Sequence, residues 1–255
     1  MDVAQRHSIE IDYWRASEHE APESDSVYNI INKVADAPTF LGCLHRHYAV
    51  GVPGQHVVEL GSGQGWAACL FKRLYPATHV TATDISQFAV ESVSKWEYVW
   101  RTKLDNAYAC RSYETKEADE SVDLVFCFAA AHHFVKHEAT LREIRRILKP
   151  GGRALYLYEP TSPKVLHPLA HWRVNRIRPA VPEDVLITRR IVSLGAKHGL
   201  SVVVDYFPST ERRGPAETLY YHVLQKLTFL QSWLPCTANF VITKDAYPAA
   251  SLEQM

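Results

Sequence analysis

The chain has 255 residues, 47% hydrophobic and 22% charged, values typical of a globular protein that buries the core of one α/β domain. Its 28 Lys and Arg residues balance its 28 Asp and Glu residues, which argues against nucleic acid or an anionic membrane as partner and favours a small molecule. Five widely spaced cysteines without a CxxC pair exclude a disulfide framework or a zinc knuckle, and with no apolar leader or 18-residue apolar run they indicate a cytoplasmic protein.

Residues 1–50 are predicted to form a helical N-terminal cap. Apolar residues recur at helical spacing from Val27 to Val34, and the polar residues at 24–26 are candidates for the N-cap. Pro38 is expected to end this helix.

From residue 56 onward, short apolar runs alternate with amphipathic segments. Strands are predicted at 56–60, 79–85, 107–112, 122–128 and 153–159, and helices at 66–75, 86–102 and 137–148, with a KPGG turn at 149–152. Strands separated by helices indicate βαβ units and a parallel sheet.

The last third of the chain is less regular. Residues 160–187 contain five prolines and several basic side chains, and we expect them to form an insertion over the sheet edge. A helix at 188–198 is predicted to end at Gly199, followed by a strand at 200–208, a long helix at 217–234 and a final strand at 238–246.

Three glycines lie directly after the first predicted strand. Gly61, Gly63 and Gly65 allow a tight turn and a close approach of the backbone to a ligand, and Asp84 ends the next strand, where a carboxylate can accept hydrogen bonds from ribose hydroxyls. A dinucleotide fingerprint would place its third glycine where this chain has Trp66, so NAD and FAD are disfavoured. The turn therefore predicts a site for a cofactor with a single nucleoside.

Four motifs in register carry a resemblance to a known family. The stretch from Glu59 to Gly65 resembles motif I of class I S-adenosylmethionine-dependent methyltransferases. The later motifs are Thr83-Asp84-Ile85-Ser86, the stretch from Asp123 to Phe134, and Leu148-Lys149-Pro150-Gly151-Gly152. The resemblance implies a Rossmann-like, doubly wound α/β sheet of about seven strands with the last strand antiparallel, occupying residues 51–255. In such a fold the insertions at 160–187 and 209–237 are expected to shape the acceptor site.

The same resemblance implies how S-adenosylmethionine, and its product S-adenosylhomocysteine, would bind. Backbone around Gly61 and Gly63 would meet the methionine part, Glu59 would order the loop from below, and Asp84 would hold the ribose. The remaining residues implied at the cofactor are Ser62, Gly65, Ile85 on the adenine, and Phe128 and Ala129 near the sulfonium.

The end of the third strand departs from the family pattern. Many members have an aspartate there that meets the adenine edge, whereas this chain has Ser112 and Tyr113. Either Ser112 substitutes for the aspartate or Glu114 reaches back to the adenine.

The N-terminal segment carries aromatic side chains that offer a cover for the cofactor. Tyr13, Trp14 and His19 are candidates to close over it, Tyr13 by its hydroxyl and the others by their rings. The alternative is that they only hold the cap against the sheet.

The expected reaction is in-line transfer of a methyl group to a small molecule, with a hydroxyl oxygen as the expected acceptor atom. A hydroxyl must lose its proton, and His132 and His133 follow the fourth strand beside the expected position of the methyl group. Glu159, at the expected end of the fifth strand, is a third catalytic candidate. No metal site is predicted, because two adjacent histidines do not share one helix face and the pair His167 and His171 has no third ligand nearby in the sequence.

Three alternatives remain open. The methyl acceptor can be nitrogen or carbon, the scaffold can bind the cofactor without methyl transfer, and a homodimer is compatible with the sequence. Nucleic-acid methylation is disfavoured because CFAAAHHF after the fourth strand lacks the N/D-P-P-Y/F tetrapeptide.

Overall fold

The computed structural model describes residues 2–48, 51–177, 181 and 183–246, which are built around an eight-stranded sheet. Its strand order is β3-β2-β1-β4-β5-β8-β7, and β6 is added by pairing with β5. The parallel strands are β1 (His56–Leu60), β2 (His79–Asp84), β3 (Asn106–Ala109), β4 (Val122–Phe128) and β5 (Leu148–Ser162).

One strand near the far edge of the sheet, β8, runs in the opposite direction to its neighbours. Strand β8 (Cys236–Lys244) runs antiparallel to both β5 and β7 (Leu200–Tyr206), while the short β6 (Leu186–Ile187) pairs parallel with the end of β5. The predicted doubly wound α/β fold with an antiparallel last strand is therefore confirmed.

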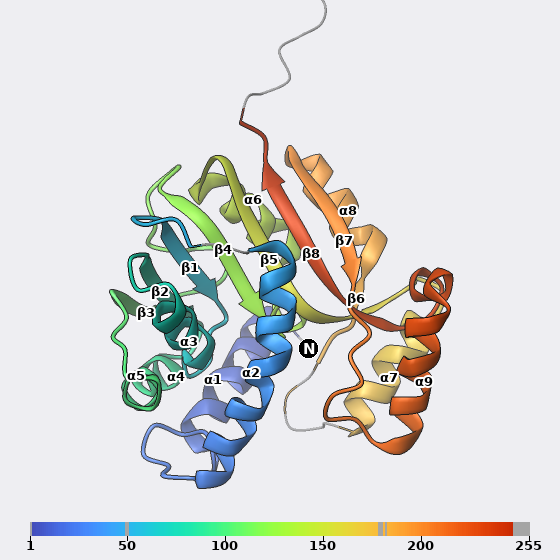
Figure 1. Ribbon diagram of the computed structural model, residues 1–255, viewed down its shortest axis with the longest axis horizontal. Coiled ribbons are helices and arrows are strands. Elements are labelled where there is room, and N and C mark those ends of the chain that lie inside the picture. Colours follow the sequence, from blue (N-terminus) through green and yellow to red (C-terminus); the bar gives the residue numbers. More distant parts are fainter. Residues whose placement is uncertain (1, 49–50, 178–180, 182, 247–255) are drawn as a thin grey trace, which may run out of the picture.

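Helices cover both faces of this sheet (Figure 1). One face is packed by α2 (Val27–His47), α3 (Trp66–Leu74) and α5 (Val93–Trp100), and the other by α6 (His137–Ile147) and α8 (Thr188–Lys197). Strand β4 shows why both layers form, because Leu124 and Phe126 enter one core while Val125 and Cys127 enter the other.

The remaining elements lie at the end of the sheet where the parallel strands finish (Figure 1). They are α1 (Val3–Ala16), α4 (Gln87–Glu91), the 3₁₀ turn η1 (Ala131–His133), α7 (His167–Ile177), α9 (Pro215–Lys226) and the 3₁₀ turn η2 (Thr228–Ser232). None of the helices in the described part of the chain has the length and apolar character needed to cross a membrane.

Helix α2 begins as predicted but does not end where Pro38 was expected to end it. Ser26 is the N-cap, and its hydroxyl accepts a hydrogen bond from the backbone N–H of Asn29. The helix continues to His47 because Phe40 and Leu44 are fully buried in the core, which outweighs the hydrogen bond lost at Pro38.

Three other predicted boundaries were wrong. The helix expected at 86–102 is two helices that meet at Ser92, and the helix expected at 217–234 ends at Lys226, because Leu227 leaves the helical region (φ −109°, ψ 71°). The KPGG segment is the start of β5, since Leu148 already pairs with Val122, and β5 runs on past Glu159 to Ser162.

Candidate functional site

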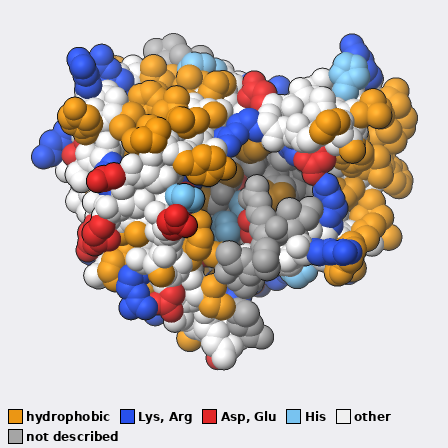
Figure 2. Space-filling model, turned by 90° about the horizontal axis from the view of Figure 1, so that it is seen from below, with side chains coloured by type: hydrophobic (Ala, Val, Ile, Leu, Met, Phe, Trp, Pro, Cys, Tyr) orange, Lys and Arg blue, Asp and Glu red, His pale blue; other side chains and the backbone are white. Residues whose placement is uncertain are grey.

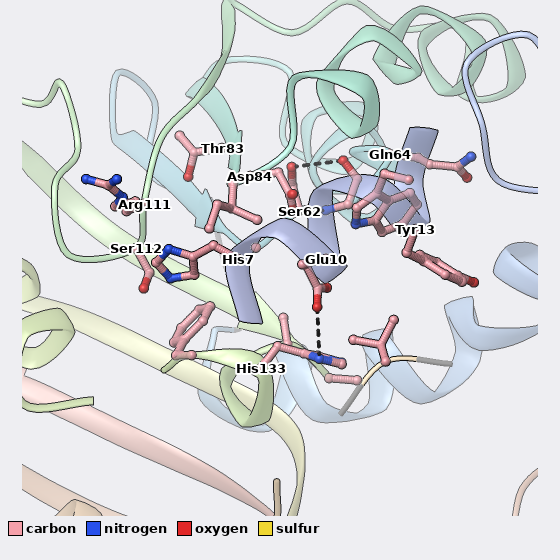
Figure 3. A pocket seen from close by; sticks show the side chains of 18 of the residues that line it. His7, Glu10, Tyr13, Ser62, Gln64, Thr83, Asp84, Arg111, Ser112 and His133 are labelled. Atoms are coloured by element: carbon pink, nitrogen blue, oxygen red, sulfur yellow. Dashed lines mark hydrogen bonds and ion pairs between the residues drawn. The ribbon is translucent and has the colours of Figure 1, made fainter. Parts of the chain in front are cut away.

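A cavity of about 550 Å³ opens at the carboxyl ends of the parallel strands. Its walls come from the loop after β1, the ends of β2 and β4, the segment after β3, helix α1 and residues Val181 and Glu183. Figure 2 shows the hollow on this face, with histidine and acidic side chains inside it, and Figure 3 shows the lining. This is the edge at which open parallel sheets bind ligands.

The glycine loop forms the floor of the cavity. Gly61, Gly63 and Gly65 all have positive φ (66°, 52° and 77°), a conformation that disfavours any side chain. The ring of Trp14 from α1 lies against Gly63, so closely that a Cβ atom there would meet it at 2.9 Å. Glycine is thus required here by the backbone conformation and by the packing of α1.

Glu59 lies beneath this loop, fully inside the protein. Its carboxylate accepts the backbone N–H of Ala68 at 2.9 Å, in the first turn of α3, and burial raises its pKa well above the usual value. Glu59 therefore makes a hydrogen bond to backbone as expected, but this bond holds the first turn of α3 and not the glycine loop itself.

Asp84 links the end of β2 to the glycine loop. Its two carboxylate oxygens accept the backbone N–H groups of Gly63 (2.8 Å) and Ser86 (2.9 Å). Burial raises the pKa of Asp84 to about 6, against the lowering effect of these hydrogen bonds. A carboxylate with two oxygens can accept further hydrogen bonds, so Asp84 remains able to bind the hydroxyls of a ribose.

Gln64 is a residue of the loop that the sequence did not single out. It is fully buried, its Oε1 accepts hydrogen bonds from Asn29 of α2 (2.8 Å) and from the indole of Trp96, and its Nε2 donates to the backbone carbonyl of Glu20 (2.8 Å). It therefore fastens the N-terminal segment to the glycine loop. Only the three-dimensional contacts reveal this role.

The segment after β3 supplies the adjoining wall. Ser112 and Tyr113 line the cavity, and the Ser112 hydroxyl lies 2.9 Å from that of Thr140. Glu114 forms a salt bridge with Arg111 on the surface and is absent from the described lining of the cavity. Of the two alternatives for the adenine contact, the geometry favours Ser112.

The two histidines of η1 have different surroundings. His132 is buried, and its Nδ1 lies 2.9 Å from Glu159; burial opposes protonation of this ring, but the hydrogen bond and charge of Glu159 outweigh it and raise the pKa of His132. His133 lines the cavity, and its Nδ1 lies 3.6 Å from the Glu10 carboxylate of α1 (Figure 3).

Glu159 was expected at a strand end facing the ligand, and this placement was wrong. It is fully buried at a register shift between β5 and β8, and neither it nor His132 is among the described residues that line the cavity. Its carboxylate accepts the backbone N–H groups of Ala130, Ala131 and His132 and thus fixes the η1 turn. Next to it, Ala129 (φ 46°) and Tyr158 (φ 58°) adopt the left-handed region, as is common near functional sites.

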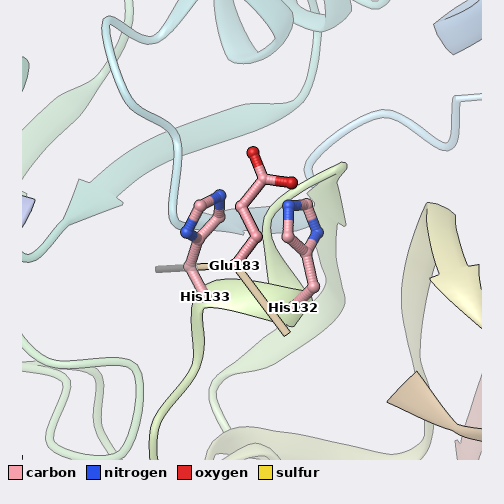
Figure 4. Close-up of side chains that lie close together, drawn as sticks. All are labelled: His132, His133 and Glu183. Atoms are coloured by element: carbon pink, nitrogen blue, oxygen red, sulfur yellow. The ribbon is translucent and has the colours of Figure 1, made fainter. Parts of the chain in front are cut away.

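Residues far apart in the sequence complete the site beside His133. Glu10 lines the cavity, and burial and then the charge of Asp84 raise its pKa to about 7. Glu183 places its carboxylate between the rings of His132 and His133 (Figure 4), and one ligand atom of each of these three residues lies within 4.8 Å of the others. No sequence motif predicted these two glutamates.

Two of the three aromatic candidates of the N-terminal segment line the cavity, and the third does not. Tyr13 and Trp14 line the cavity, and the Tyr13 hydroxyl donates to Glu20, whereas His19 contacts the hydroxyl of Ser26 outside the described lining. His167 lies against Asp184 at 3.2 Å. The other expected cofactor residues, Ser62, Ile85, Phe128 and Ala129, all line the cavity.

Comparisons with known proteins agree with this geometry. Residues 58–156 match the model of a family described as a methyltransferase domain. The chain is 26% identical over 140 residues to the ubiquinone/menaquinone biosynthesis C-methyltransferase of Cupriavidus metallidurans, covering 52% of this chain and 55% of that protein. It is 27% identical over 161 residues to phthiotriol/phenolphthiotriol dimycocerosates methyltransferase 1 of Mycobacterium ulcerans, covering 61% and 56%. The chain thus spans little more than half the length of these relatives.

A solved structure shares the whole architecture. Geranyl diphosphate C-methyltransferase of Streptomyces coelicolor A3(2), in complex with Mg²⁺, geranyl diphosphate and S-adenosyl-L-homocysteine, superposes with a TM-score of 0.68, covering 96% of this chain and 99% of that one. At 12% identity this likeness shows the fold alone.

Proposed function

We propose that this protein, which carries a methyltransferase domain of the class I S-adenosylmethionine-dependent family, transfers the methyl group of S-adenosylmethionine to a hydroxyl oxygen of a small molecule. The observation that carries the proposal is one continuous cavity that joins the glycine loop and Asp84 to the histidines and carboxylates around His133. Cofactor and acceptor can therefore meet inside a single enclosure.

The lining of the cavity supports an orientation for the cofactor. The methionine part would lie over Gly61 and Gly63, Asp84 would accept the ribose hydroxyls, and Ile85 would pack on the adenine. The other contacts proposed are Ser112 and Tyr113 at the adenine edge, Phe128 and Ala129 near the sulfonium, and Tyr13 from above. All of these residues face the cavity.

The chemistry is a displacement at the methyl carbon. A lone pair of the acceptor oxygen forms the new O–CH₃ bond as the S–CH₃ bond breaks, and the electron pair of that bond stays on sulfur as a neutral thioether. Holding the two reactants in line contributes up to about 7–11 kcal/mol in well-oriented systems. The hydroxyl proton leaves to the histidine–carboxylate cluster, with His133 as the member that lines the cavity.

The size of the acceptor follows from what covers the cavity. Among the described residues, helix α1, Val181 and Glu183 line the cavity beside the glycine loop, and a cavity of about 550 Å³ with such a lining supports a small molecule as acceptor over nucleic acid. The unpaired state of all five cysteines agrees with a location in the reducing cytosol.

Carbon is the second candidate for the acceptor atom, because two of the similar proteins are C-methyltransferases by name. Carbon and oxygen acceptors are distinguished by the ¹³C chemical shift of the product formed with ¹³C-methyl-labelled cofactor. A product with the label on carbon would replace the hydroxyl assignment and leave the cofactor site unchanged.

The cofactor site is tested by calorimetry with S-adenosylhomocysteine. We expect binding to the native protein and its loss in Asp84→Ala and in Gly63→Val, since the valine would collide with Trp14. Unchanged affinity in either variant would contradict the assignment.

The acceptor side is tested with labelled cofactor and pools of hydroxylated small molecules. His133→Ala is expected to bind S-adenosylhomocysteine normally but to transfer methyl groups about 10²–10⁴-fold more slowly. Full turnover in this variant would remove His133 from the mechanism.

A further inference from the structure

The histidines of η1 and the segment before β6 converge on one point in the cavity wall. His132 and His133 are adjacent in the sequence, yet on the 3₁₀ turn their rings lie 4.2 Å apart, inclined by 42°, so both face the same space. The Glu183 carboxylate lies between the two rings in the same space (Figure 4). Three potential ligand atoms, two nitrogens and one oxygen, therefore lie within 4.8 Å of one another.

A carboxylate lies behind each of the two imidazoles. His132 Nδ1 is hydrogen-bonded to Glu159 at 2.9 Å, and His133 Nδ1 lies 3.6 Å from Glu10, an ion-pair distance too long for a hydrogen bond. Histidines that bind metal ions almost always donate their other ring N–H to a carboxylate, a backbone carbonyl or water, which fixes the tautomer and makes the ring more basic. His132 has such a partner in Glu159.

The position of Glu159 is itself firmly determined. Its carboxylate accepts backbone N–H groups from Ala130 and Ala131 as well as from His132, and it is fully buried. The direction of the His132 ring is therefore set before any ligand arrives, which is the preorganisation that an ion site requires.

The charges of the cluster also favour a cation. Glu10, Glu159 and Glu183 place three carboxyl groups around the two histidines, whereas Arg6 lines the same cavity as one cationic side chain. Carboxyl groups around the histidines thus outnumber this cationic side chain, and a divalent ion would offset the excess.

We propose that His132, His133 and Glu183 bind one divalent first-row transition ion, such as Mn²⁺ or Zn²⁺. Two imidazoles and one carboxylate suit such ions, whereas Mg²⁺ and Ca²⁺ prefer oxygen ligands throughout. Ion–ligand distances of about 2.0–2.2 Å require the three atoms to lie closer together than the 4.8 Å that separates them at most in this structure.

Three protein ligands leave a coordination position open toward the cavity. Resting on the proposed function, we assign this position to the acceptor hydroxyl, whose oxygen the ion would bind and whose proton it would make easier to lose. With both imidazoles bound to the ion, this proton would pass to Glu10, which lines the cavity, in place of His133. Acceptors with a second oxygen next to the hydroxyl, such as vicinal diols or hydroxy acids, would then be preferred because they can chelate the ion.

The site is tested by titrating the full-length, untagged, chelator-treated protein with Mn²⁺ and following the free ion by electron paramagnetic resonance. We expect one ion per chain, and at least about tenfold weaker binding in His133→Ala and in Glu183→Gln. His133 and Glu183 are chosen because their side chains are half-buried, and circular dichroism can confirm that both variants fold as the native protein does. His132 is not chosen because it is hydrogen-bonded to the buried Glu159, so its replacement could disturb the fold.

The matched control is a double variant of the other histidine pair, His167→Ala with His171→Ala, whose rings lie 5.7 Å apart on α7. It should bind Mn²⁺ as the native protein does. Absence of stoichiometric Mn²⁺ and Zn²⁺ binding, or binding that the control removes and His133→Ala does not, overturns the ion site.

Methyl transfer distinguishes the failure of this site from failure of the proposed function. Full transfer by ion-free protein overturns the ion site and leaves the methyltransferase assignment standing. Ion binding that depends on His133 and Glu183, in a protein that methylates no hydroxyl acceptor, supports the site and contradicts the function.

Discussion

Asp84 is a buried carboxylate on which cofactor binding is expected to depend. Its pKa is raised to about 6 by burial, so its ionised form predominates only above that pH. Ribose hydroxyls donate hydrogen bonds to the ionised form, and a protonated Asp84 must first lose its proton. We therefore predict that the affinity for S-adenosylhomocysteine is constant above about pH 7 and falls about tenfold per pH unit below about pH 6.

The control for this pH dependence is Asp84→Asn, measured by calorimetry over the same range. The amide does not titrate, so its affinity should be lower than native at high pH and should show no step near pH 6. A native affinity that stays level as the pH falls well below 6 would contradict the role given to the Asp84 carboxylate.

Glu159 holds the η1 turn by accepting hydrogen bonds from backbone N–H groups and from His132. In Glu159→Gln an amide NH₂ replaces one of the two acceptor oxygens and leaves a buried donor without an acceptor. We predict a loss of about 1–3 kcal/mol in the free energy of unfolding, and a larger loss in Glu159→Ala. Chemical denaturation measures both.

The matched control is Glu114→Gln, which removes an exposed charge paired with Arg111. Exposed pairs of this kind contribute about 0–1 kcal/mol, so this variant should unfold almost as the native protein does. Equal effects at Glu114 and Glu159 would mean that the buried carboxylate does not hold the turn.

At the scale of elements, helix α1 covers the site without entering the core. It contains no buried residue, and it meets the rest of the protein through α4 and through Trp14 on Gly63, Glu10 near His133 and His7 near Tyr113. Elements with few buried contacts open at low cost in free energy. A cofactor in the cavity adds contacts to α1 and should hold it closed.

We predict that S-adenosylhomocysteine slows amide hydrogen exchange in residues 3–16 by roughly tenfold or more. Helix α6, whose Leu141 and Ile144 are fully buried in the core, serves as the internal control and should exchange equally slowly with and without the ligand. Exchange in α1 that does not respond to the ligand would contradict its role as a cover.

The elements that the sequence predicted well are those whose pattern is local. The run VDLVFCF is apolar on both faces and bounded by polar residues, and β4 has the same first and last residue as this run. Pro38 and Leu227 gave the wrong boundaries, because the continuation of α2 depends on Phe40 and Leu44 reaching the core, and the break after α9 is not marked by glycine or proline. The local pattern of apolar residues does not show which side chains become buried through tertiary contacts.

The same division holds for the site. The glycine loop, Glu59 and Asp84 lie within two consecutive βα units, so their spacing along the chain fixes their spacing in space. Glu10 and Glu183 are far apart in the sequence and approach His133 only in the folded structure. No periodicity or motif in a single sequence encodes that meeting.

At the scale of the whole molecule, the strand order places the site between the two halves of the chain. The glycine loop after β1 and the η1 turn after β4 lie next to each other because β1 and β4 are neighbours in the sheet, where the order reverses. Residues of the N-terminal helix α1, together with Val181 and Glu183, then line the cavity at this edge. A ligand in the cavity therefore contacts residues from Arg6 to Glu183 and should stabilise the entire fold.

We predict a rise in Tm with S-adenosylhomocysteine. A ligand at about 100 times its Kd adds about 2.7 kcal/mol to the free energy of unfolding, which for a chain of this size corresponds to about 5–10 °C. NADH at the same concentration should leave Tm unchanged, because Trp66 occupies the position where a dinucleotide site needs glycine and packs instead against Phe40 and Phe128. Gly63→Val should lose the response to S-adenosylhomocysteine. A shift with NADH as large as that with S-adenosylhomocysteine would mean that the glycine loop accepts a pyrophosphate after all, and that Trp66 moves away from the core to admit it.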